Sequence, residues 1–324
     1  MTYNGTIETD YQGEFIKPCP GTPLHVCCGY EIINFARGCT LGCNYCILDC
    51  YFGQERPTVF SNRGDLYHEV ESALRESDRF IRYGTGEFTD SLLFEKDYPI
   101  YDRLIPLFAN QDRAVLEIKT KTVNVQPLLE MKERENIIVS WSLNSDYIAR
   151  KDEARAPSVG SRIEAARKVQ ERGFKLGFHF DPIIHHSGWK DGYGETIALL
   201  FSSIDPEKVV YISMGTLRFM PSMADHLKRA GTGLELGEFV RGIDGKSRYF
   251  RPLRTRIYRE VLSRLEEHVD RSRVYLCMES PEVWKDVFGI DNMDSQKLKE
   301  RLDEACYSRF DGLRRPPYRR LPDD

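Results

Sequence analysis

Three cysteines that lie close together in the sequence have a spacing suited to an iron–sulfur cluster. Cys39, Cys43 and Cys46 form a C-x3-C-x2-C pattern. Soft thiolate sulfurs suit iron–sulfur clusters, and three of them from one loop can wrap one corner of a cubane cluster. A cluster held by three cysteines keeps one iron open to a small molecule. The pattern therefore predicts a [4Fe–4S] cluster with one open coordination position.

The same segment allows a different metal site. Cys50 follows closely, and the four cysteines from Cys39 to Cys50 could hold a structural zinc ion. A zinc ribbon would carry a second C-x2-C pair downstream, and this sequence has none. Three further cysteines, Cys19, Cys27 and Cys28, are interpreted either as buried free thiols or as a second metal site.

Composition bounds the class of protein. The chain has 324 residues, a formal net charge of −4 and 41% hydrophobic residues, which is enough for a substantial core. The odd number of cysteines, and the polar stretch from Met1 to Gly21 where an export signal would stand, argue against a disulfide framework. No run approaches the roughly 18 apolar residues of a membrane span. We therefore expect a cytoplasmic protein with no membrane association.

Alternating strands and helices are expected to position these residues. Six apolar or β-branched runs read as buried parallel strands: Tyr30–Ala36, Phe80–Gly84, Ala114–Lys119, Ile137–Ser142, Phe174–Phe180 and Val209–Met214. Five helical patterns separate them: Leu66–Glu76, Tyr101–Ala109, Val125–Arg134, Ser161–Arg172 and Tyr193–Ser203. This alternation predicts an α/β fold with a parallel sheet, either doubly wound or a partly closed barrel.

The alternation also suggests how the chain is divided. We expect an N-terminal extension over residues 1–29, a core over 30–220 and a C-terminal extension over 221–324. In the last part the pattern predicts helices and one strand, at Arg254–Val269, Val274–Met278, Glu282–Val287 and Ser295–Ala305.

Residue types suited to chemistry follow four of the predicted strands. They are the cysteine loop, Gly84-Thr85-Gly86-Glu87, the group Asp181, His185 and His186, and Gly215-Thr216. Ligand sites in α/β folds lie at the carboxyl ends of the strands, so a single site built from these loops is the simplest prediction. The histidines, together with His179, allow a metal or acid–base role or a hydrogen-bonded core role.

The cysteine spacing resembles the signature of the radical SAM enzymes. In that superfamily the open iron chelates the amino and carboxylate groups of S-adenosylmethionine (SAM), and one electron cleaves the sulfonium to give a 5′-deoxyadenosyl radical. Tyr45 stands where members place an aromatic residue against the adenine. Gly84 to Glu87 resemble the motif that receives the SAM amino group, in which only glycine lets the backbone approach closely.

Taken together, the motifs resemble the spore photoproduct lyase family of radical SAM DNA-repair enzymes. The matching segments span nearly the whole chain: Cys19–Thr22, Cys27–Tyr30, Cys39–Phe52, Gly84–Ser91, Leu116–Lys121, Ser140–Asn144, Phe178–Pro182, Tyr211–Phe219 and Tyr275–Glu279. The resemblance implies a partial (β/α)6 TIM-type barrel with a C-terminal α/β extension that helps to clamp DNA. It also implies a lyase whose adenosyl radical takes hydrogen from C6 of the thymine dimer 5-thyminyl-5,6-dihydrothymine, after which two thymines are restored.

The resemblance implies particular site residues as well. Cys39, Cys43 and Cys46 would bind the cluster. The SAM contacts would be Tyr45, Gly84, Gly86, Glu87, Asp90, Ser91, Lys121 and Ser142, and the catalytic residues would be Tyr45 and Tyr51. An ammonium group at a strand end, such as that of Lys121, can pair with the SAM carboxylate or ribose oxygens.

Two positions depart from the family's pattern. Phe88 stands where spore photoproduct lyases carry the cysteine that returns a hydrogen to the product radical, and a phenyl ring has no hydrogen weak enough to donate. Ile47 stands where they often carry a tyrosine of the relay that regenerates SAM. Cys50, Cys277 or Tyr51 could substitute. Alternatively, the same radical-generating core could act on another substrate, such as a modified base, a nucleotide or a peptide.

A basic and aromatic stretch, Lys246–Arg259, reads KSRYFRPLRTRIYR. Such side chains suit phosphate contact and base stacking, although a run of this kind is as often a solvated face. We expect DNA as the nucleic-acid partner, and the resemblance implies an electron donor such as flavodoxin or ferredoxin. A non-catalytic, zinc-stabilised nucleic-acid-binding protein is the interpretation from a different class.

Overall fold

One large, mainly parallel sheet organises the molecule. The computed structural model describes residues 5–22, 24–53, 56–229 and 239–315. The strand order of the sheet is β14-β10-β9-β8-β7-β6-β3-β2. In that order the strands are Val274–Leu276, Val209–Thr216, Lys175–Ile183, Ile137–Ser142, Ala114–Thr120, Ile81–Gly84, Glu31–Ile33 and Ile16–Pro18. Every neighbouring pair is parallel except β2 with β3, which is antiparallel.

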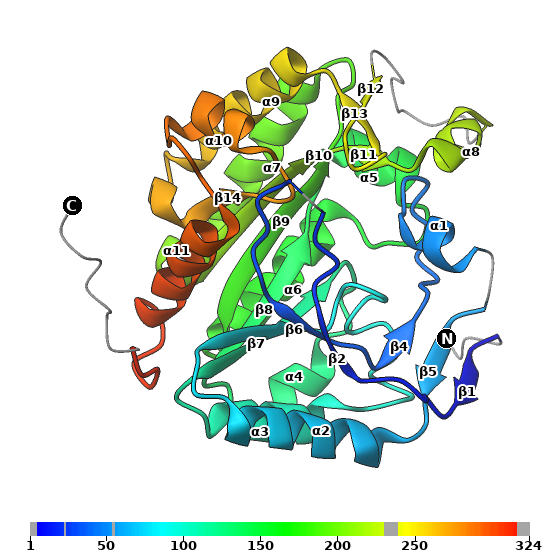
Figure 1. Ribbon diagram of the computed structural model, residues 1–324, viewed down its shortest axis with the longest axis vertical. Helices are drawn as coiled ribbons and strands as arrows, with labels where there is room; N and C mark the ends of the chain where they lie inside the picture. The colour runs from blue at the N-terminus through cyan, green and yellow to red at the C-terminus, as the bar shows by residue number, and fades with distance from the viewer. Residues whose placement is uncertain (1–4, 23, 54–55, 230–238, 316–324) are drawn as a thin grey trace.

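The sheet is the partial TIM-type barrel that the family resemblance implies, and of the two arrangements that the residue pattern left open it is the partly closed one. It curls without closing, and helices cover its outer side (Figure 1). All six residues of β8 and all eight of β10 are buried. Parallel strands covered on both faces need such continuous apolar runs, which is why the six predicted strands could be recognised.

Helices follow the strands and pack against them. Before β10 they are α1 Leu48–Phe52, α2 Arg63–Glu76, α3 Tyr101–Ala109, α4 Gln126–Glu130, α5 Asp146–Asp152, α6 Val159–Glu171 and α7 Trp189–Ser203. After it they are α8 Ala224–Arg229, α9 Arg251–Leu265, α10 Pro281–Phe288 and α11 Ser295–Tyr307. Helix α3 packs on β7, α6 on β8 and β9, and both α9 and α11 on β10. None of the helices in the described part of the chain is both long and apolar enough to cross a membrane.

Both predicted extensions contribute to the main sheet. Strand β14 comes from the C-terminal part and pairs with β10, while β2 comes from the N-terminal part and pairs with β3. Two small sheets flank the barrel. One joins β1 Ile7–Thr9, β5 Thr58–Phe60 and β4 Ala36–Arg37, and the other joins β11 Arg218–Phe219, β13 Ser247–Tyr249 and β12 Phe239–Arg241.

Two predicted elements differ in their course from the structure, and one helix beside the site was not predicted. The strand predicted over Tyr30–Ala36 is divided into β3, which pairs with β2 and β6 in the main sheet, and β4, which pairs with β5 in a small one. The helix predicted to run to Arg134 ends at Glu130, since Met131 has an extended backbone. Helix α5 was not predicted. It is short and polar, and its start is capped by the Ser145 hydroxyl, which accepts from the Ile148 N–H (3.4 Å).

Glu95 is a buried carboxyl group that should make stability depend on pH. It accepts backbone hydrogen bonds from Ile100 (3.1 Å) and Tyr101 (3.1 Å), and burial raises its pKa from 4.5 to about 8. A carboxyl whose folded pKa is raised favours the folded state below the unfolded pKa, and that contribution is lost as pH rises to the folded value. Glu95→Gln should therefore flatten the fall in Tm between pH 5 and pH 8. Exposed Glu71 on α2, changed to Gln, is the control, and an equal slope in wild type and Glu95→Gln would contradict the argument.

Candidate functional site

The loops at the carboxyl ends of the strands enclose a cavity of about 280 Å³ that is lined by both polar and apolar side chains. Its walls include side chains from the cysteine loop, from the loop after β6 and from the ends of β7, β8, β9 and β10. The predicted site residues on its surface are Tyr45, Cys46, Tyr51, Gly86, Glu87, Lys121 and Ser142. The structure thus brings together residues that lie almost 100 positions apart in the sequence.

The cysteine loop is held in place by the segment around α5. Gly42 has a positive φ of 66°, which lets the loop turn between Cys39 and Cys43. The Asn44 backbone N–H donates to the Asp152 carbonyl (2.8 Å), and its side-chain amide donates to the Asp152 carboxylate (3.1 Å). The cluster loop therefore has a fixed place beside the cavity.

The three cysteines of this loop are the donor set that would hold a cluster. Cys43 is buried, and burial raises the pKa of its thiol to about 12. Cys46 and Cys43 both act electrostatically on Cys39, so the three thiols lie in one neighbourhood. Among the described residues no three Cys, His, Asp or Glu side chains are grouped as they would be around a single bound ion. Soft thiolates are the ligands of iron–sulfur clusters, so the chemistry of this donor set would suit one.

The fourth cysteine of the zinc interpretation points elsewhere. The Cys50 sulfur, on α1, lies 3.6 Å from the Ser222 hydroxyl. Cys46 lines the cavity, whereas Cys39, Cys43 and Cys50 do not. The contact with Ser222 does not favour Cys50 as a fourth metal ligand.

Tyr45 is fixed by a buried ion pair below it. Its hydroxyl donates to Glu153, and the same carboxylate is bonded to Arg162, with both partners fully buried. Burial alone would raise the pKa of Glu153, but Lys121 and Arg162 hold it below its ordinary value. The Lys121 ammonium lies 5.9 Å from the centre of the Tyr45 ring. The ring and the ammonium thus form one wall of the cavity.

The loop after β6 needs glycine at both predicted positions. A Cβ on Gly84 would lie 2.6 Å from the Tyr30 ring, and one on Gly86 would lie 3.0 Å from the Lys119 carbonyl oxygen. This close approach places the Glu87 carboxylate where it accepts from the Tyr30 hydroxyl and the Lys119 ammonium. Burial would raise the pKa of Glu87, yet Lys119 and these hydrogen bonds hold it below its ordinary value.

Asp90 and Ser91 lie behind the cavity wall, where they hold backbone. The Asp90 carboxylate accepts from the Thr120 hydroxyl (2.7 Å) and from the Lys121 backbone N–H (2.6 Å). The Ser91 hydroxyl accepts from the Lys119 N–H (3.1 Å). Both residues therefore tie the loop after β6 to the end of β7, and neither lines the cavity.

The two positions that depart from the family's pattern, Phe88 and Ile47, both line the cavity. The Phe88 ring packs edge-on against Phe52, with the ring centres 6.2 Å apart. Tyr51 is on the same wall and is 47% exposed, so it faces the opening. Phe88, whose ring cannot donate a hydrogen atom, is thus part of the cavity wall.

The sequence reasoning missed Glu117, the centre of a buried polar network at the cavity, although it named His179 as an acid–base, metal or hydrogen-bonded core candidate. The Glu117 carboxylate bonds to His179 (2.6 Å), to the Ser140 hydroxyl (2.6 Å) and to the Tyr211 hydroxyl (2.8 Å). Burial opposes ionisation, but His179 and these hydrogen bonds lower the pKa of Glu117 to about 2. The sequence did contain a signal for this network. Glu117 and Lys119 are two charged residues at positions i and i+2 of an otherwise apolar strand, so both point to the same face of the sheet.

Other predicted loop residues serve packing. His186 bonds to the Ser145 hydroxyl (2.8 Å) and stacks on Tyr147, and neither His185 nor His186 lines the cavity. Asp181 does line it, paired with Arg218 (3.0 Å), a residue that was not predicted. A Cβ on Gly215 would lie 2.6 Å from Asp181, so that glycine makes room for the pair.

The basic stretch Lys246–Arg259 is not one exposed stripe, which corrects the sequence interpretation. Arg248, Tyr249, Arg254 and Tyr258 are buried, and Arg254 pairs with Glu279 (3.1 Å). The helix that carries most of the stretch buries one face against α7 and α10. Periodicity shows that α9 has two faces but does not show which arginines neighbouring helices cover.

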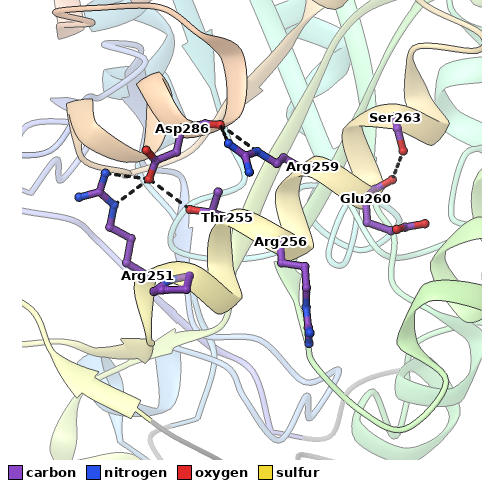
Figure 2. Close-up of a pocket in the computed structure, with 8 residues that line it drawn as sticks. Arg251, Thr255, Arg256, Arg259, Glu260, Ser263 and Asp286 are labelled. Carbon is purple, nitrogen blue, oxygen red and sulfur yellow. Dashed lines mark hydrogen bonds and ion pairs between the residues drawn. The ribbon is translucent and has the colours of Figure 1, made fainter.

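The exposed face of α9 keeps three arginines around a shallow hollow of about 580 Å³. They are Arg251, Arg256 and Arg259. Figure 2 shows Arg251 and Arg259 turned toward Asp286 and Arg256 directed away from it. Arg251 bonds to the Asp286 carboxylate (2.8 Å) and Arg259 to its carbonyl (2.9 Å). The basic surface is thus smaller than the sequence suggests and partly neutralised.

Comparison with known proteins gives one consistent result. The family model for spore photoproduct lyase matches residues 27–226. The spore photoproduct lyase of Bacillus subtilis is 32% identical over 181 residues, covering 53% of this chain and 50% of that protein. The enzyme of a Geobacillus strain is 30% identical over 165 residues, covering 50% of this chain and 48% of that protein. The chain thus spans about half the length of the curated relatives it matches.

Solved structures match over a larger share of the chain. A spore photoproduct lyase variant with bound AdoMet and dinucleoside spore photoproduct superposes with a TM-score of 0.73 at 22% identity, covering 85% of this chain and 82% of that one. A spore photoproduct lyase complexed with the dinucleoside photoproduct gives 0.72 at 22% identity, with coverages of 84% and 81%. At this identity the superposition establishes the fold.

Proposed function

The chain belongs to the spore photoproduct lyase family, and on that premise we propose that it is a radical SAM lyase acting on a nucleic-acid base lesion. One observation carries the proposal. The cavity places the cluster loop, through Cys46, beside Glu87, Lys121 and Ser142. These are the residue types that an amino acid-bearing nucleoside such as SAM needs, namely an anion for its ammonium and cations or hydroxyls for its oxygens.

The proposed roles follow from the positions of the side chains. Cys39, Cys43 and Cys46 would bind the [4Fe–4S] cluster, and when bound it supplies the electron that starts the radical chemistry. Glu87 would receive the SAM ammonium, since its carboxylate is kept ionised. Tyr45 and Lys121 would orient the rest of SAM from the opposite wall.

The remaining proposed contacts divide into two groups. Ser142 and Gly86 line the cavity and would contact SAM directly. Gly84, Asp90 and Ser91 would act through other residues, because they shape and hold the loop that carries Glu87. Tyr51, exposed at the opening, is proposed as a relay or substrate contact.

For the substrate we propose the thymine dimer that the relatives' names describe. A spore photoproduct lyase of the same fold has been solved with the dinucleoside spore photoproduct, which supports this choice. The exposed arginines of α9 would contact DNA phosphates, and a flavodoxin or ferredoxin would donate the electron. Phe88 favours the second candidate, in which the same core acts on another modified base, nucleotide or peptide.

The test uses anaerobically reconstituted protein, SAM, a reductant and the dinucleoside spore photoproduct. The lyase proposal expects release of 5′-deoxyadenosine or turnover of SAM, together with restored thymine. SAM cleavage without restored thymine would favour the second candidate. A protein that leaves SAM intact under every reducing condition would overturn both.

Lys119 should set the pH range over which SAM binds. Its ammonium pairs with Glu87 and raises the fraction of ionised carboxylate. In Lys119→Met the pKa of Glu87 should rise, so that lowering the pH protonates the group that receives the SAM ammonium. A charge-assisted hydrogen bond of about 1.5–3 kcal/mol corresponds to about 10- to 100-fold in affinity.

The measurement is SAM binding to the reconstituted protein by calorimetry between pH 5.5 and 8. Wild type should bind with little pH dependence, and Lys119→Met should weaken steadily toward pH 5.5. Lys119→Arg keeps the cation and should restore the flat profile. The same profile in Lys119→Met and wild type would rule out this role for Lys119.

A further inference from the structure

A second group of thiols, separate from the predicted cluster loop in the sequence, lines the same cavity. Cys19, Cys27 and Cys28 all line the cavity and are free thiols. Cys19 directly follows β2, and Cys27 and Cys28 precede β3. The antiparallel pairing of these strands brings the two segments together, and the Cys19 N–H donates to the Tyr30 carbonyl (3.0 Å).

Cys19 lies near enough to Cys27 and Cys28 for the three thiols to shift one another's ionisation. Its thiol is the hydrogen-bond donor to both neighbours, which raises the pKa of Cys19. The same hydrogen bond, helped by Arg218, lowers the pKa of Cys27 to about 6. Gly21 leaves room for the contact, since a Cβ there would lie 3.0 Å from the Cys27 sulfur. One protonated thiol therefore rests against an ionisable one.

The thiols of this group are hydrogen-atom donors, which the proposed reaction requires. A substrate radical formed in the cavity must receive a hydrogen atom, and Phe88 has none to give. A thiol S–H bond is weaker than a C–H bond of the substrate and can supply one. Cys19 is also close enough to Glu87 for that carboxylate to influence its ionisation, so it lies on the SAM side of the cavity.

We propose that Cys19 and Cys27 form a redox-active pair that ends the reaction by hydrogen-atom transfer from Cys19. The substrate radical gains the hydrogen atom and becomes a closed-shell product, which leaves a thiyl radical on Cys19. That radical joins the Cys27 thiolate, and the resulting disulfide radical anion gives one electron to an oxidised flavodoxin- or ferredoxin-type carrier. The sulfur–hydrogen bond breaks, the sulfur–sulfur bond forms, and a dithiol reductant resets the pair.

The hydrogen-transfer step rests on the proposed function, but the pair can be tested without turnover. Trypsin should release residues 1–37 as one peptide, because Lys17 precedes a proline and Arg37 is the next basic residue. This peptide holds Cys19, Cys27 and Cys28 and no other cysteine. The number of alkyl groups it takes up therefore reports on this group of thiols alone.

The experiment equilibrates the reconstituted holoenzyme with glutathione buffers of rising oxidised fraction and then adds N-ethylmaleimide. The wild-type peptide should pass from three labels to one. Cys19→Ala and Cys27→Ala should keep two labels throughout, and Cys28→Ala should pass from two to none. Cys50→Ala, which removes a thiol outside the cavity, should behave as wild type. A wild-type peptide with three labels in every buffer overturns the pair, and oxidation that persists in Cys27→Ala overturns the choice of partner.

A second experiment, done under turnover, tests the hydrogen-donor role of the thiol pair separately from the proposed substrate. With the dinucleoside photoproduct and no added dithiol, Cys19→Ala should cleave SAM within about twofold of wild type yet restore thymine at least about tenfold more slowly. The wild-type peptide should lose two labels as product forms. Equal thymine restoration by both proteins would overturn the hydrogen-donor role. If wild type restores no thymine, the substrate proposal fails, while the labelling result still decides whether the pair exists.

Cys277 is the rival donor within the cavity. Its sulfur accepts from the Arg218 guanidinium (3.7 Å), and burial raises the pKa of its thiol, so it is protonated as well. We assign the transfer to Cys19, whose radical can join the Cys27 thiolate, so Cys277→Ala should restore thymine at a rate close to that of wild type. A loss in this variant with full activity in Cys19→Ala would move the donor role to Cys277 and overturn the proposal.

Discussion

Cys43→Ala should abolish SAM cleavage and reduce the iron content of the reconstituted protein. Cys43 is the buried member of the three cysteines, and the backbone around it is bonded to the α5 region. Three ligands are the minimum for a cluster with one open iron, and alanine offers no replacement ligand. Clusters held by two thiolates lose iron readily, so we expect activity to fall at least about 1,000-fold, toward the background without enzyme.

The measurements are iron and sulfide content, absorbance near about 400 nm from thiolate-to-iron charge transfer, and 5′-deoxyadenosine release. Cys50→Ala is the matched control, because Cys50 lies only four residues after Cys46 and contacts Ser222 instead of the cavity. It should keep the colour and the SAM cleavage of wild type. A colourless Cys50→Ala protein would restore the zinc or four-cysteine interpretation. Full SAM cleavage by Cys43→Ala would exclude the cluster assignment.

Arg162→Met should cause the largest loss of stability among the site variants and should also misplace Tyr45. The Arg162 guanidinium is fully buried and donates to Glu153, to the Pro157 carbonyl (2.9 Å) and to the Ser142 carbonyl (3.0 Å). Removing one member of a buried ion pair leaves the other charge without compensation, which typically costs about 3–5 kcal/mol. For a chain of this size that corresponds to on the order of 10 °C in Tm.

Two further variants make the test specific. Arg167→Met on the same helix removes an exposed arginine that pairs with Glu164 and Glu171, and it should leave Tm close to that of wild type. Glu153→Gln combined with Arg162→Met leaves no unpaired charge and should recover part of the lost stability. If Arg162→Met and Arg167→Met lower Tm equally, the buried pair has no special role. Thermal unfolding followed by circular dichroism gives all four values.

Local features of the fold could be predicted because each depends on a short stretch of sequence. The strands of the barrel were recognisable from continuous apolar runs such as Ile137–Ser142, which the structure confirms as β8. The cysteine loop was recognisable because its three candidate ligands lie within one turn-rich segment. Glycines such as Gly84 and Gly86 pointed to close backbone approach, which the Tyr30 ring and the Lys119 carbonyl now explain.

Contacts between distant segments could not be predicted in the same way. Arg254 and Tyr258 read as part of a basic, aromatic surface, but Glu279 pairs with both from another element. Glu117 read as an ordinary strand residue, and the sequence left His179 between a metal or acid–base role and a hydrogen-bonded core role; the folded sheet brings the two side chains to 2.6 Å. A charge is buried or exposed according to what packs over it, and sequence periodicity does not record the covering element.

The sequence by itself determined how the chemistry would start, because the spacing of Cys39, Cys43 and Cys46 on one loop is a local property. Only the tertiary structure decided what surrounds that start. It placed Phe88 in the cavity wall, paired Arg162 with the Glu153 that holds Tyr45, and brought Cys19 and Cys27 to the same cavity from either side of the β2–β3 pair. The physical reason is the parallel sheet, which gathers the carboxyl ends of strands from across the chain at one edge.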